Sequence, residues 1–229
     1  MGLPEEDIIS VGIHKRYVLY LVGPVLICSH GMGGPSTSIL LHEVAKLLKY
    51  ANADAQWIRM GTSGGIGVEE GSLVVTKQPL NSDLEPFHES IILGERVRRA
   101  TNFDQELCSK LYHAAKKAAK AKVEIGLTIS CYDFYEGQLR SDGAICEFSE
   151  AEKKAFLEDI QKKGVRNMEM DSVQFGAFCN TIGVRAGMMC VTLVNRFERD
   201  QISDDPQVLD DYEQRLIDSM IVFITDNIK

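Results

Sequence analysis

Short apolar runs alternate with stretches of helical spacing along most of the chain, which is the pattern of an α/β protein. The runs that predict strands are 16–22, 25–29, 57–60, 73–76, 123–130, 165–170 and 186–194. The stretches that predict helices are 39–50, 105–121, a segment that begins at Ser149, 172–181 and 206–228. Residues 79–102 are mixed and polar, and we predict a loop there. Residues 1–15 predict no regular element.

The alternation of strands and helices predicts a three-layer α/β/α sandwich with a mostly parallel or mixed central sheet. The run 186–194 has no polar alternation, as expected of a strand that is buried on both faces. No linker or internal repeat divides the chain, so we predict one domain over residues 1–229. Ligands of such sheets bind at the carboxyl ends of strands. The loops that this rule selects follow Ser29, Met60, Ser130, Met170 and Val194.

The composition excludes several classes of partner. The 229 residues carry a formal net charge of −8 and no basic run, so nucleic acid and anionic membrane surfaces are poor partners. No apolar stretch has the length of a membrane span, and the N-terminal residues do not read as a signal peptide. The six cysteines show neither a CxxC pair nor metal-ligand spacing. We therefore expect reduced thiols, a cytoplasmic protein and no bound metal.

The stretch 55–67 (AQWIRMGTSGGIG) is the first candidate for a binding site. Its apolar run ends in glycines and hydroxyls at 61–65, where backbone N–H groups would face a ligand at the end of a strand. Arg59 could add a fixed positive charge beside that loop. Together they would suit an anion. The alternative is an ordinary glycine-rich turn after a buried strand, with Arg59 on a solvated face.

The loop after Ser130 is the second candidate. It places an aromatic ring (Phe134), an amide (Gln138) and a guanidinium (Arg140) within seven residues. The ring could stack on a planar heterocycle while the other two side chains reach the edge of that heterocycle. The alternative is a surface loop with one structural Phe and solvated polar residues.

A pair of carboxylates is the third candidate. Glu169 and Asp171 lie two residues apart, so they would point to the same side if the strand continued through them. Such a pair could bind a diol, a sugar or a metal. The alternative is a cap on the next helix, with Asp171 or Ser172 as the N-cap residue. His30, in the glycine-rich loop after Ser29, is interpreted as a structural histidine.

Four segments resemble the uridine phosphorylases, a branch of the nucleoside phosphorylase and nucleosidase superfamily, and the animal enzymes in particular. These segments are 61–65 (GTSGG), 134–140 (FYEGQLR), 169–171 (EMD) and 191–196 (VTLVNR). The resemblance covers nearly the whole chain from Arg16 on and implies a nucleoside phosphorylase-like fold. It also implies reversible phosphorolysis of uridine to uracil and ribose 1-phosphate, with phosphate as a co-substrate and no cofactor. Two alternatives stay open: a pyrimidine nucleosidase, and a catalytically weak nucleoside-binding isoform.

The same resemblance assigns roles to individual residues. Phosphate would be bound by Arg16, Arg59, Gly61 and Thr62, with Arg16 reaching the site of the neighbouring subunit in a homodimer. Ribose would contact Thr62, Glu169, Met170 and Asp171. Uracil would contact Phe134, Gly137, Gln138, Arg140, Leu193, Val194 and Arg196. The residues expected to act in catalysis are Arg59, Thr62, Gln138 and Arg140, and residues 197–206 would form a mobile flap.

The sequence departs from the pattern of the resembled family at two places. Relatives have a further strand upstream of Arg16, with a glycine and an arginine that complete the phosphate site, and we find no counterpart in residues 1–15. We therefore expect either missing residues or a weakened phosphate site. The family usually has Glu where this chain has Asp171, which is shorter by one methylene, or about 1.5 Å. We expect this difference to weaken the grip on the ribose hydroxyls.

Overall fold

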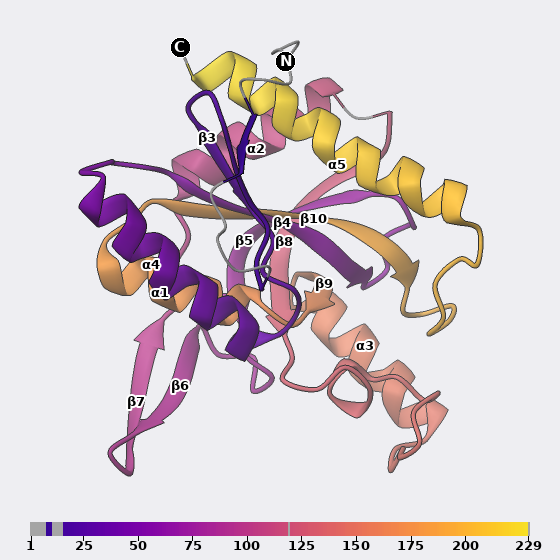
Figure 1. Ribbon diagram of the computed structural model, residues 1–229. Coiled ribbons are helices and arrows are strands. Elements are labelled where there is room, and N and C mark those ends of the chain that lie inside the picture. Colours follow the sequence, from indigo (N-terminus) through magenta and orange to yellow (C-terminus); the bar gives the residue numbers. More distant parts are fainter. Residues whose placement is uncertain (1–7, 11–15, 119, 229) are drawn as a thin grey trace.

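The computed structural model describes residues 8–10, 16–118 and 120–228 (Figure 1). Its strands are β1 (Ile8–Ser10), β2 (Leu19–Val22), β3 (Val25–Cys28), β4 (Trp57–Gly65), β5 (Leu73–Leu80), β6 (Phe87–Ile92), β7 (Glu95–Ala100), β8 (Val123–Ser130), β9 (Val165–Glu169) and β10 (Ala186–Asn195). Its helices are α1 (Gly34–Tyr50), α2 (Gln105–Ala118), the 3-10 turn η2 (Glu136–Gln138), α3 (Glu150–Lys162), α4 (Ser172–Ile182) and α5 (Pro206–Asn227).

A mixed sheet forms the centre of the molecule. Its strands are hydrogen-bonded in the order β10-β4-β9-β8-β5, and β5 closes the sheet by pairing with β10. The pairs β10/β4, β5/β8 and β8/β9 are parallel, while β4/β9 and β10/β5 are antiparallel. Helices α2 and α5 cover one side of these strands, and α1 and α4 lie on the other (Figure 1). The predicted layered α/β fold with a mixed central sheet is confirmed.

The burial of β10 explains its continuous apolar sequence. Every residue of this strand is buried except Leu193 and Asn195, because β10 lies between β4 and β5 with helices packed against it. The main hydrophobic core joins this strand to α2, α4 and α5. No helix in the described part of the chain is both long and apolar enough to cross a membrane.

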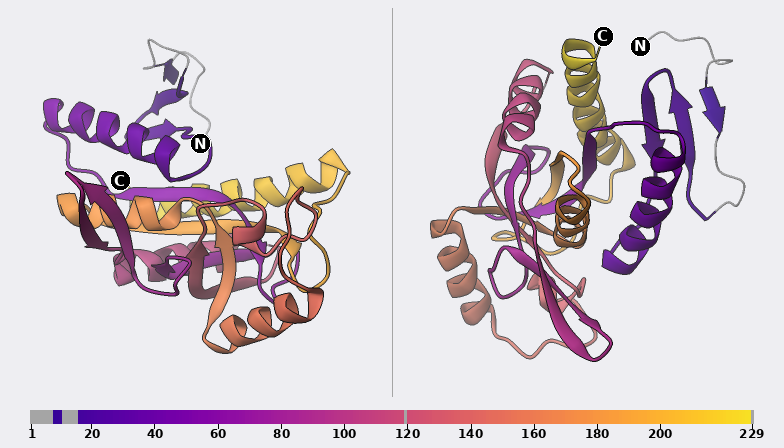
Figure 2. Two further views of the ribbon diagram at one scale, coloured as in Figure 1. Left: turned by 90° about the horizontal axis from the view of Figure 1, so that it is seen from below. Right: turned by 90° about the vertical axis from the view of Figure 1, so that its left-hand side faces the viewer.

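The N-terminal strands form a sheet of their own. Strands β1, β2 and β3 are antiparallel and do not join the central sheet. The predicted pair of strands around 16–29 is confirmed, with Gly23 at a positive φ of 55° in the tight turn between them. Together with α1, this sheet stands to one side of the other elements (Figure 2). The short strand β1 was not predicted from the sequence.

The glycine-rich segment 61–65 corrects our first prediction, because it is strand rather than loop. Strand β4 continues through Gly65, and its pairing with β10 extends from Trp57 to Gly65. The segment pairs with β10 on one side and, at Gly64 and Gly65, with β9 on the other, so it forms strand rather than an open turn. Gly61 and Gly64 instead leave space for arginine side chains.

Residues 79–102 also differ from the prediction of a loop. Strand β5 runs on to Leu80, and β6 and β7 form a hairpin that projects from the molecule (Figure 1). Leu93 and Gly94, both at positive φ, make the two-residue turn, as tight hairpins require. Glu89 pairs across the strands with Arg96 and Arg98. Because much of the hairpin is polar and lies outside the core, the sequence shows no clear alternation there.

Helix α3 begins with a complete capping box. The Ser149 hydroxyl accepts the backbone N–H of Glu152, and the Glu152 carboxylate accepts the backbone N–H of Ser149. The inner face of the helix carries Leu157 and Ile160 into a second core. The full set of buried residues in that core is Ile66, Ile129, Cys131, Leu157, Ile160, Val165 and Met168. This core supports the loop that follows β8, since Leu139 packs against it.

The second core should depend on Leu157, which is 1% exposed. We expect Leu157→Ala to lower the free energy of unfolding by about 2–5 kcal/mol, because it removes buried methyl groups and leaves a cavity. Lys154→Ala, one turn away and exposed on the same helix, should change it by less than about 0.5 kcal/mol. Urea unfolding followed by circular dichroism measures both values. Equal stabilities of the two variants would contradict this account of the core.

Candidate active site

Arg59 is buried and paired with both carboxylates of the third candidate. Its Nη2 lies 2.5 Å from Asp171 Oδ2, and its Nη1 lies 3.2 Å from Glu169 Oε2. Because β9 runs antiparallel to β4, the chain that leaves β9 at Glu169 passes back along β4 toward Arg59. Burial alone would lower the pKa of the guanidinium, but Glu169, Cys190 and Asp171 hold it above its usual value. The alternative of Arg59 on a solvated face is wrong.

Gly61 makes room for this guanidinium. A Cβ built on Gly61 would lie 2.9 Å from both Nη atoms of Arg59, closer than real Cβ contacts. Thr62 is exposed, and strand alternation puts it on the opposite face of β4 from Arg59. Arg16 is exposed in the segment before β2 and forms no ion pair with any described residue. The structure thus brings only Arg59 and Gly61 of the four predicted phosphate residues together.

The two carboxylates have different partners. Glu169 accepts the backbone N–H groups of Asp171 (2.8 Å) and Ser172 (3.0 Å) and the Ser172 hydroxyl (2.6 Å), so it caps α4 from the preceding strand. Asp171 occupies the N-cap position, yet its side chain makes no cap bond. Its Oδ1 instead accepts the Thr37 hydroxyl at 2.7 Å. The alternative of a helix cap is therefore right, but the carboxylate that caps α4 is Glu169 rather than Asp171. Met170, between these two residues, is half-buried.

Thr37 and His30 belong to this cluster, although sequence reasoning gave neither of them a role in the site. Thr37 donates its hydroxyl proton to Asp171, so its oxygen accepts from His30 Nδ1 at 3.1 Å. That geometry requires the proton of a neutral His30 to sit on Nδ1. Burial lowers the pKa of His30, and the Arg59 charge lowers it further against the opposing effect of Asp171. The glycine-rich loop around His30 was the available sequence signal.

Residues 131–142, the first part of the segment between β8 and α3, form the predicted base-binding loop, called the base loop here. Arg196, 2% exposed at the end of β10, donates from Nη2 to the carbonyl of Gln138. The Gln138 side chain is buried, and its amide makes no hydrogen bond within the described part of the chain. A Cβ on Gly64 would lie 2.8 Å from Cδ of Arg196, so Gly64 admits the arginine stem. Gln138 and Arg196 are thus brought together, and Val194 pairs with Gly64 in the sheet.

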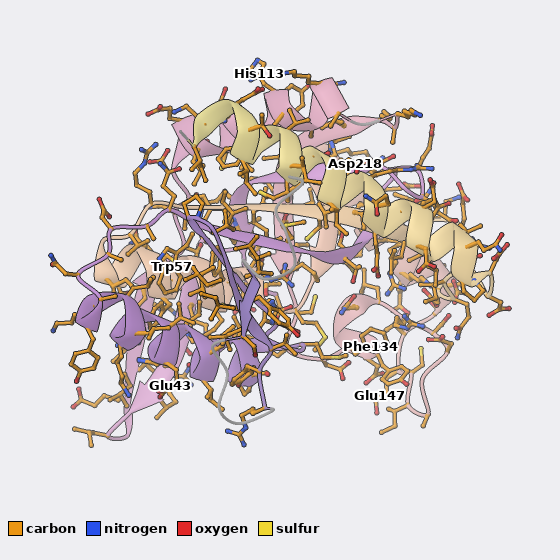
Figure 3. All side chains as sticks on the ribbon, turned by 45° about the horizontal axis from the view of Figure 1, so that its top comes forward. Glu43, Trp57, His113, Phe134, Glu147 and Asp218 are labelled. Atoms are coloured by element: carbon orange, nitrogen blue, oxygen red, sulfur yellow. The ribbon has the colours of Figure 1, made fainter. Side chains whose placement is uncertain are left out.

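Arg140 is less free than the prediction required. Its Nε and Nη2 donate to the two carboxylate oxygens of Asp142 at 3.0 and 2.8 Å, and this hydrogen bonding raises the pKa of Arg140. Its guanidinium also lies 4.5 Å from the centre of the Phe134 ring, which is 42% exposed. Figure 3 shows Phe134 and Glu147 at the same end of the molecule, away from Trp57. Asp142 was not predicted.

The remaining predicted base residues lie close to these elements. Gly137 donates its backbone N–H to Asp133 at 2.9 Å, which helps to close the η2 turn. Leu193 is partly buried and packs against the main core, whereas Val194 is 4% exposed. These two side chains can provide only an apolar contact.

Two buried donors have no partner in the described part of the chain, and both are arginine Nε atoms, of Arg59 and Arg196. Buried polar groups are almost always hydrogen-bonded, so these two enclosed donors are exceptions that the described residues leave unsatisfied. Arg59 belongs to β4, and the stem of Arg196 packs over Gly64 of the same strand. Because side chains alternate along a strand, the two arginines lie on opposite faces of β4. Arg59 and Gly64 are five residues apart, which is roughly 16 Å of extended chain, and Thr62 lies between them in the sequence.

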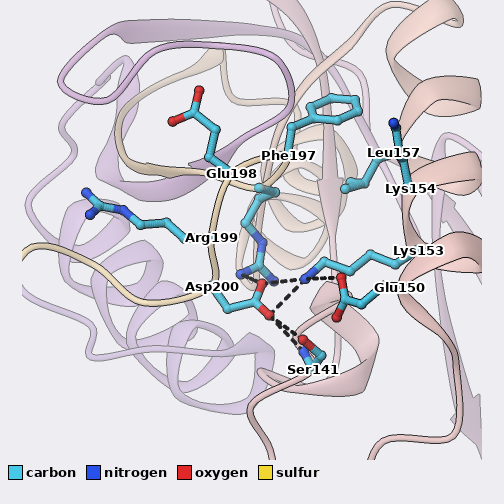
Figure 4. A pocket seen from close by; sticks show the side chains of 10 residues that line it. Ser141, Glu150, Lys153, Lys154, Leu157, Phe197, Glu198, Arg199 and Asp200 are labelled. Atoms are coloured by element: carbon cyan, nitrogen blue, oxygen red, sulfur yellow. Dashed lines mark hydrogen bonds and ion pairs between the residues drawn. The ribbon is translucent and has the colours of Figure 1, made fainter.

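A cavity of about 420 Å³ lies between α3 and the chain after β10 (Figure 4). Its lining residues are Ser141, Glu150, Lys153, Lys154, Leu157, Arg196, Phe197, Glu198, Arg199 and Asp200. Apart from Arg196, none of the predicted site residues lines it. Among the described residues, no group of three or more His, Cys, Asp or Glu side chains is placed to hold a metal ion.

Comparisons with known proteins match this fold. Residues 5–220 match the family described as the Phosphorylase superfamily. Uridine phosphorylase 2 of Mus musculus is 47% identical over 201 residues, which cover 87% of this chain and 63% of the mouse protein. The inactive uridine phosphorylase B of Schistosoma mansoni is 44% identical over 216 residues, covering 93% of this chain and 72% of that protein.

A solved structure gives the same result. The crystal structure of uridine phosphorylase from Schistosoma mansoni in complex with thymidine has a TM-score of 0.93 and 42% identity. The match covers 99% of this chain and 78% of that one. The nucleoside phosphorylase-like fold and the resemblance found in the sequence are both confirmed. The chain belongs to the phosphorylase superfamily, and its relatives there are uridine phosphorylases.

Proposed function

We propose that this chain catalyses the reversible phosphorolysis of uridine to uracil and ribose 1-phosphate in pyrimidine salvage. The observation that carries the proposal is the buried Arg59 guanidinium held at Asp171 and Glu169, with Arg196 and the Gln138 amide, which no described residue binds, near Gly64 of the strand that carries Arg59. The names of the relatives support it. The chain spans only 63% of the length of the mouse relative, so the activity of the whole enzyme is inferred.

The chemistry needs two kinds of stabilisation. Breaking the bond between ribose C1′ and uracil N1 leaves positive charge on the sugar and negative charge on the base. The Gln138 amide would donate to a uracil carbonyl that receives the negative charge and accept from N3–H. Arg196 would add a donor on the same side. Phosphate held by Arg59 would be the nucleophile on the other side, so no side-chain nucleophile is required.

The proposed contacts follow the assignment made from the sequence, with adjustments from the geometry. Phosphate would contact Arg59, the backbone of Gly61, Thr62 and Arg16 of a neighbouring copy. Ribose would contact Thr62, Glu169, Met170 and Asp171. Uracil would contact Phe134, Gly137, Gln138, Leu193, Val194, Arg196 and the N–H groups of Arg140 that Asp142 does not use.

The proposal also covers the co-substrate, the cellular location and the oligomeric state of the enzyme. Phosphate is a co-substrate, and the reaction uses no cofactor or metal. The enzyme works in the cytoplasm as a homodimer that binds neither nucleic acid nor membranes. Arg16 supports the shared site, since it is exposed and forms no ion pair with another described residue.

A catalytically weak, nucleoside-binding chain is the second candidate. One relative of similar identity is named as inactive. The site itself gives a physical reason, because the oxygens of Asp171 are already engaged by Arg59 and Thr37. An anionic phosphate at Arg59 and a ribose at Asp171 would both have to share these groups.

Uracil release from uridine separates the candidates. We expect release that requires inorganic phosphate and that yields ribose 1-phosphate in equal amount, measured by chromatography. Arg59→Met keeps an apolar stem but removes the donors, and it should lower the rate by about a hundredfold or more, because it removes charge-assisted bonds to phosphate. Release without phosphate would indicate a nucleosidase. Uridine binding without release would indicate the second candidate.

Asp171 and Glu169 form a matched pair of variants. Asp171→Asn removes a charge-assisted acceptor for ribose, so uridine turnover should fall by about ten- to a hundredfold, with a smaller loss on 2′-deoxyuridine. Glu169→Gln weakens the cap of α4 and should mainly lower the melting temperature. Both variants leave Arg59 with one counter-charge fewer, so both should be less stable than the wild type. Full turnover in a folded Asp171→Asn variant would assign the sugar to Glu169 alone.

Mixing two inactive variants tests the shared site. The substitutions are Arg16→Ala in one subunit and Gln138→Leu in the other, and each removes a different part of the proposed site. If Arg16 serves the neighbouring copy, a mixture that exchanges subunits should regain activity, because one kind of hybrid site holds both intact residues. The steady-state rate before and after exchange measures this. A mixture shown by mass spectrometry to exchange without recovery would mean that each site is self-contained.

A further inference from the structure

One carboxylate behind the base loop collects donors from three parts of the chain. Asp200 Oδ2 accepts the backbone N–H of Ser141 at 2.9 Å, the Ser141 hydroxyl at 3.0 Å and Lys153 Nζ at 2.8 Å. Its Oδ1 accepts Arg196 Nη1 and Lys153 Nζ, each at 2.9 Å. Figure 4 shows Ser141, Lys153 and Asp200 turned toward one another at one end of the cavity.

The partners of Asp200 come from elements that are distant in sequence. Lys153 lies 47 residues earlier, in the first half of α3, and Ser141 lies 59 residues earlier, at the end of the base loop. Helix α3 is a firm support, since its capping box and its packed inner face fix its position. The carboxylate therefore holds the base loop against α3 on one side and β10 on the other.

The charged side chains around Asp200 compensate one another. Lys153, Arg196 and Asp200 are 7%, 2% and 9% exposed, and a buried charge without a partner is costly. Burial alone would raise the pKa of the Asp200 carboxyl, but Lys153, the Ser141 N–H and Arg196 hold it below its usual value. The carboxylate is therefore ionised at neutral pH.

Asp200 acts on the base loop at two points. It binds Ser141 directly, and it orients Arg196, whose other Nη donates to the carbonyl of Gln138. The two points are three residues apart, with the left-handed residue Leu139 between them at φ 57°. The backbone from the Gln138 carbonyl to Ser141 is thus fixed, whereas the side-chain amide of Gln138 is bound by no described residue.

We propose that Asp200, held by Lys153, is the positioning residue that fixes Gln138 for pyrimidine recognition and so sets the preference for uracil over cytosine. The inference rests on the proposed function only in taking a pyrimidine as the ligand of Gln138. Uracil presents N3–H and cytosine a bare N3, so discrimination depends on where the amide oxygen of Gln138 lies. A base loop released from Asp200 lets the amide turn and accommodate either edge.

Asp200→Asn tests the proposal with almost no change of shape. One side of the asparagine would present an NH₂ group to donors from Lys153, Ser141 or Arg196, so part of the cluster must separate. We expect the KM for uridine to rise about tenfold, since a charge-assisted contact is lost. The ratio of kcat/KM for uridine over cytidine should fall by a similar factor. The KM for phosphate should stay within about twofold, because Arg59 is held by other residues.

Three further variants separate positioning from general stability. Ser141→Ala removes one hydroxyl but leaves its backbone bond, so its effect on the KM for uridine should be small. Lys153→Met keeps the buried stem without the charge. Its effect on the KM for uridine should therefore lie between those of Ser141→Ala and Asp200→Asn. Val123→Ala, at the far end of β8 in the main core, should lower the melting temperature with neither kinetic change. A KM for uridine unchanged in Asp200→Asn, or a parallel rise of the KM for phosphate, would overturn the proposal.

Uracil binding by calorimetry distinguishes this inference from the proposed function. If the wild type releases no uracil from uridine, the proposed function fails, but weaker uracil binding by Asp200→Asn than by Val123→Ala still supports the role of Asp200. Equal uracil affinity in these two variants would overturn that role whatever the activity. A wild type that binds no uracil would overturn both.

Discussion

The buried pairing of Arg59 with Asp171 and Glu169 is the interaction on which the site depends. One guanidinium in the core needs compensating charge, and both carboxylates lie at the junction of β9 and α4. Thr37 extends the contact to α1, and Gly61 supplies the space. Four elements therefore meet at one cation. A change in any of them alters the electrostatic potential where an anionic substrate would bind.

The two ends of the site are built by different means. At Arg59 the protein supplies full counter-charges, so a ligand must compete with carboxylates already in place. At Gln138 the protein fixes only the backbone, through Arg196 and Asp200, and no residue of the described part of the chain binds the amide. Under the proposed function, selectivity for a base would belong to the second end, where a mismatched hydrogen bond has no protein group to replace it, and affinity for phosphate would belong to the first.

The sequence predicted the elements with regular periodicity, but not the partners of the candidate site residues. Strand β10 and helices α3 to α5 were predicted because their apolar spacing is strong. The segment 61–65 was misread because glycine is as common in turns as beneath large side chains. The pairing of Arg59 with Asp171 depends on the antiparallel contact of β4 with β9, for which periodicity gives no signal. Asp142 was missed because an isolated carboxylate carries no pattern, and Asp200 lies in the segment 197–206, for which the sequence predicted only a flap.

The glycines of β4 have a consequence for the evolution of such chains. Gly61 and Gly64 each lie beneath one arginine, whose side chain supplies the three nearest contacts that an added Cβ would meet. Neither is among the glycines at positive φ, so once its arginine is lost, selection no longer opposes a side chain there. A homologue that has replaced Arg59 should drift first at Gly61, and one that has replaced Arg196 should drift first at Gly64. The residues at the two pairs of positions, 59 with 61 and 196 with 64, would then show separately which half of an ancestral site is no longer under selection.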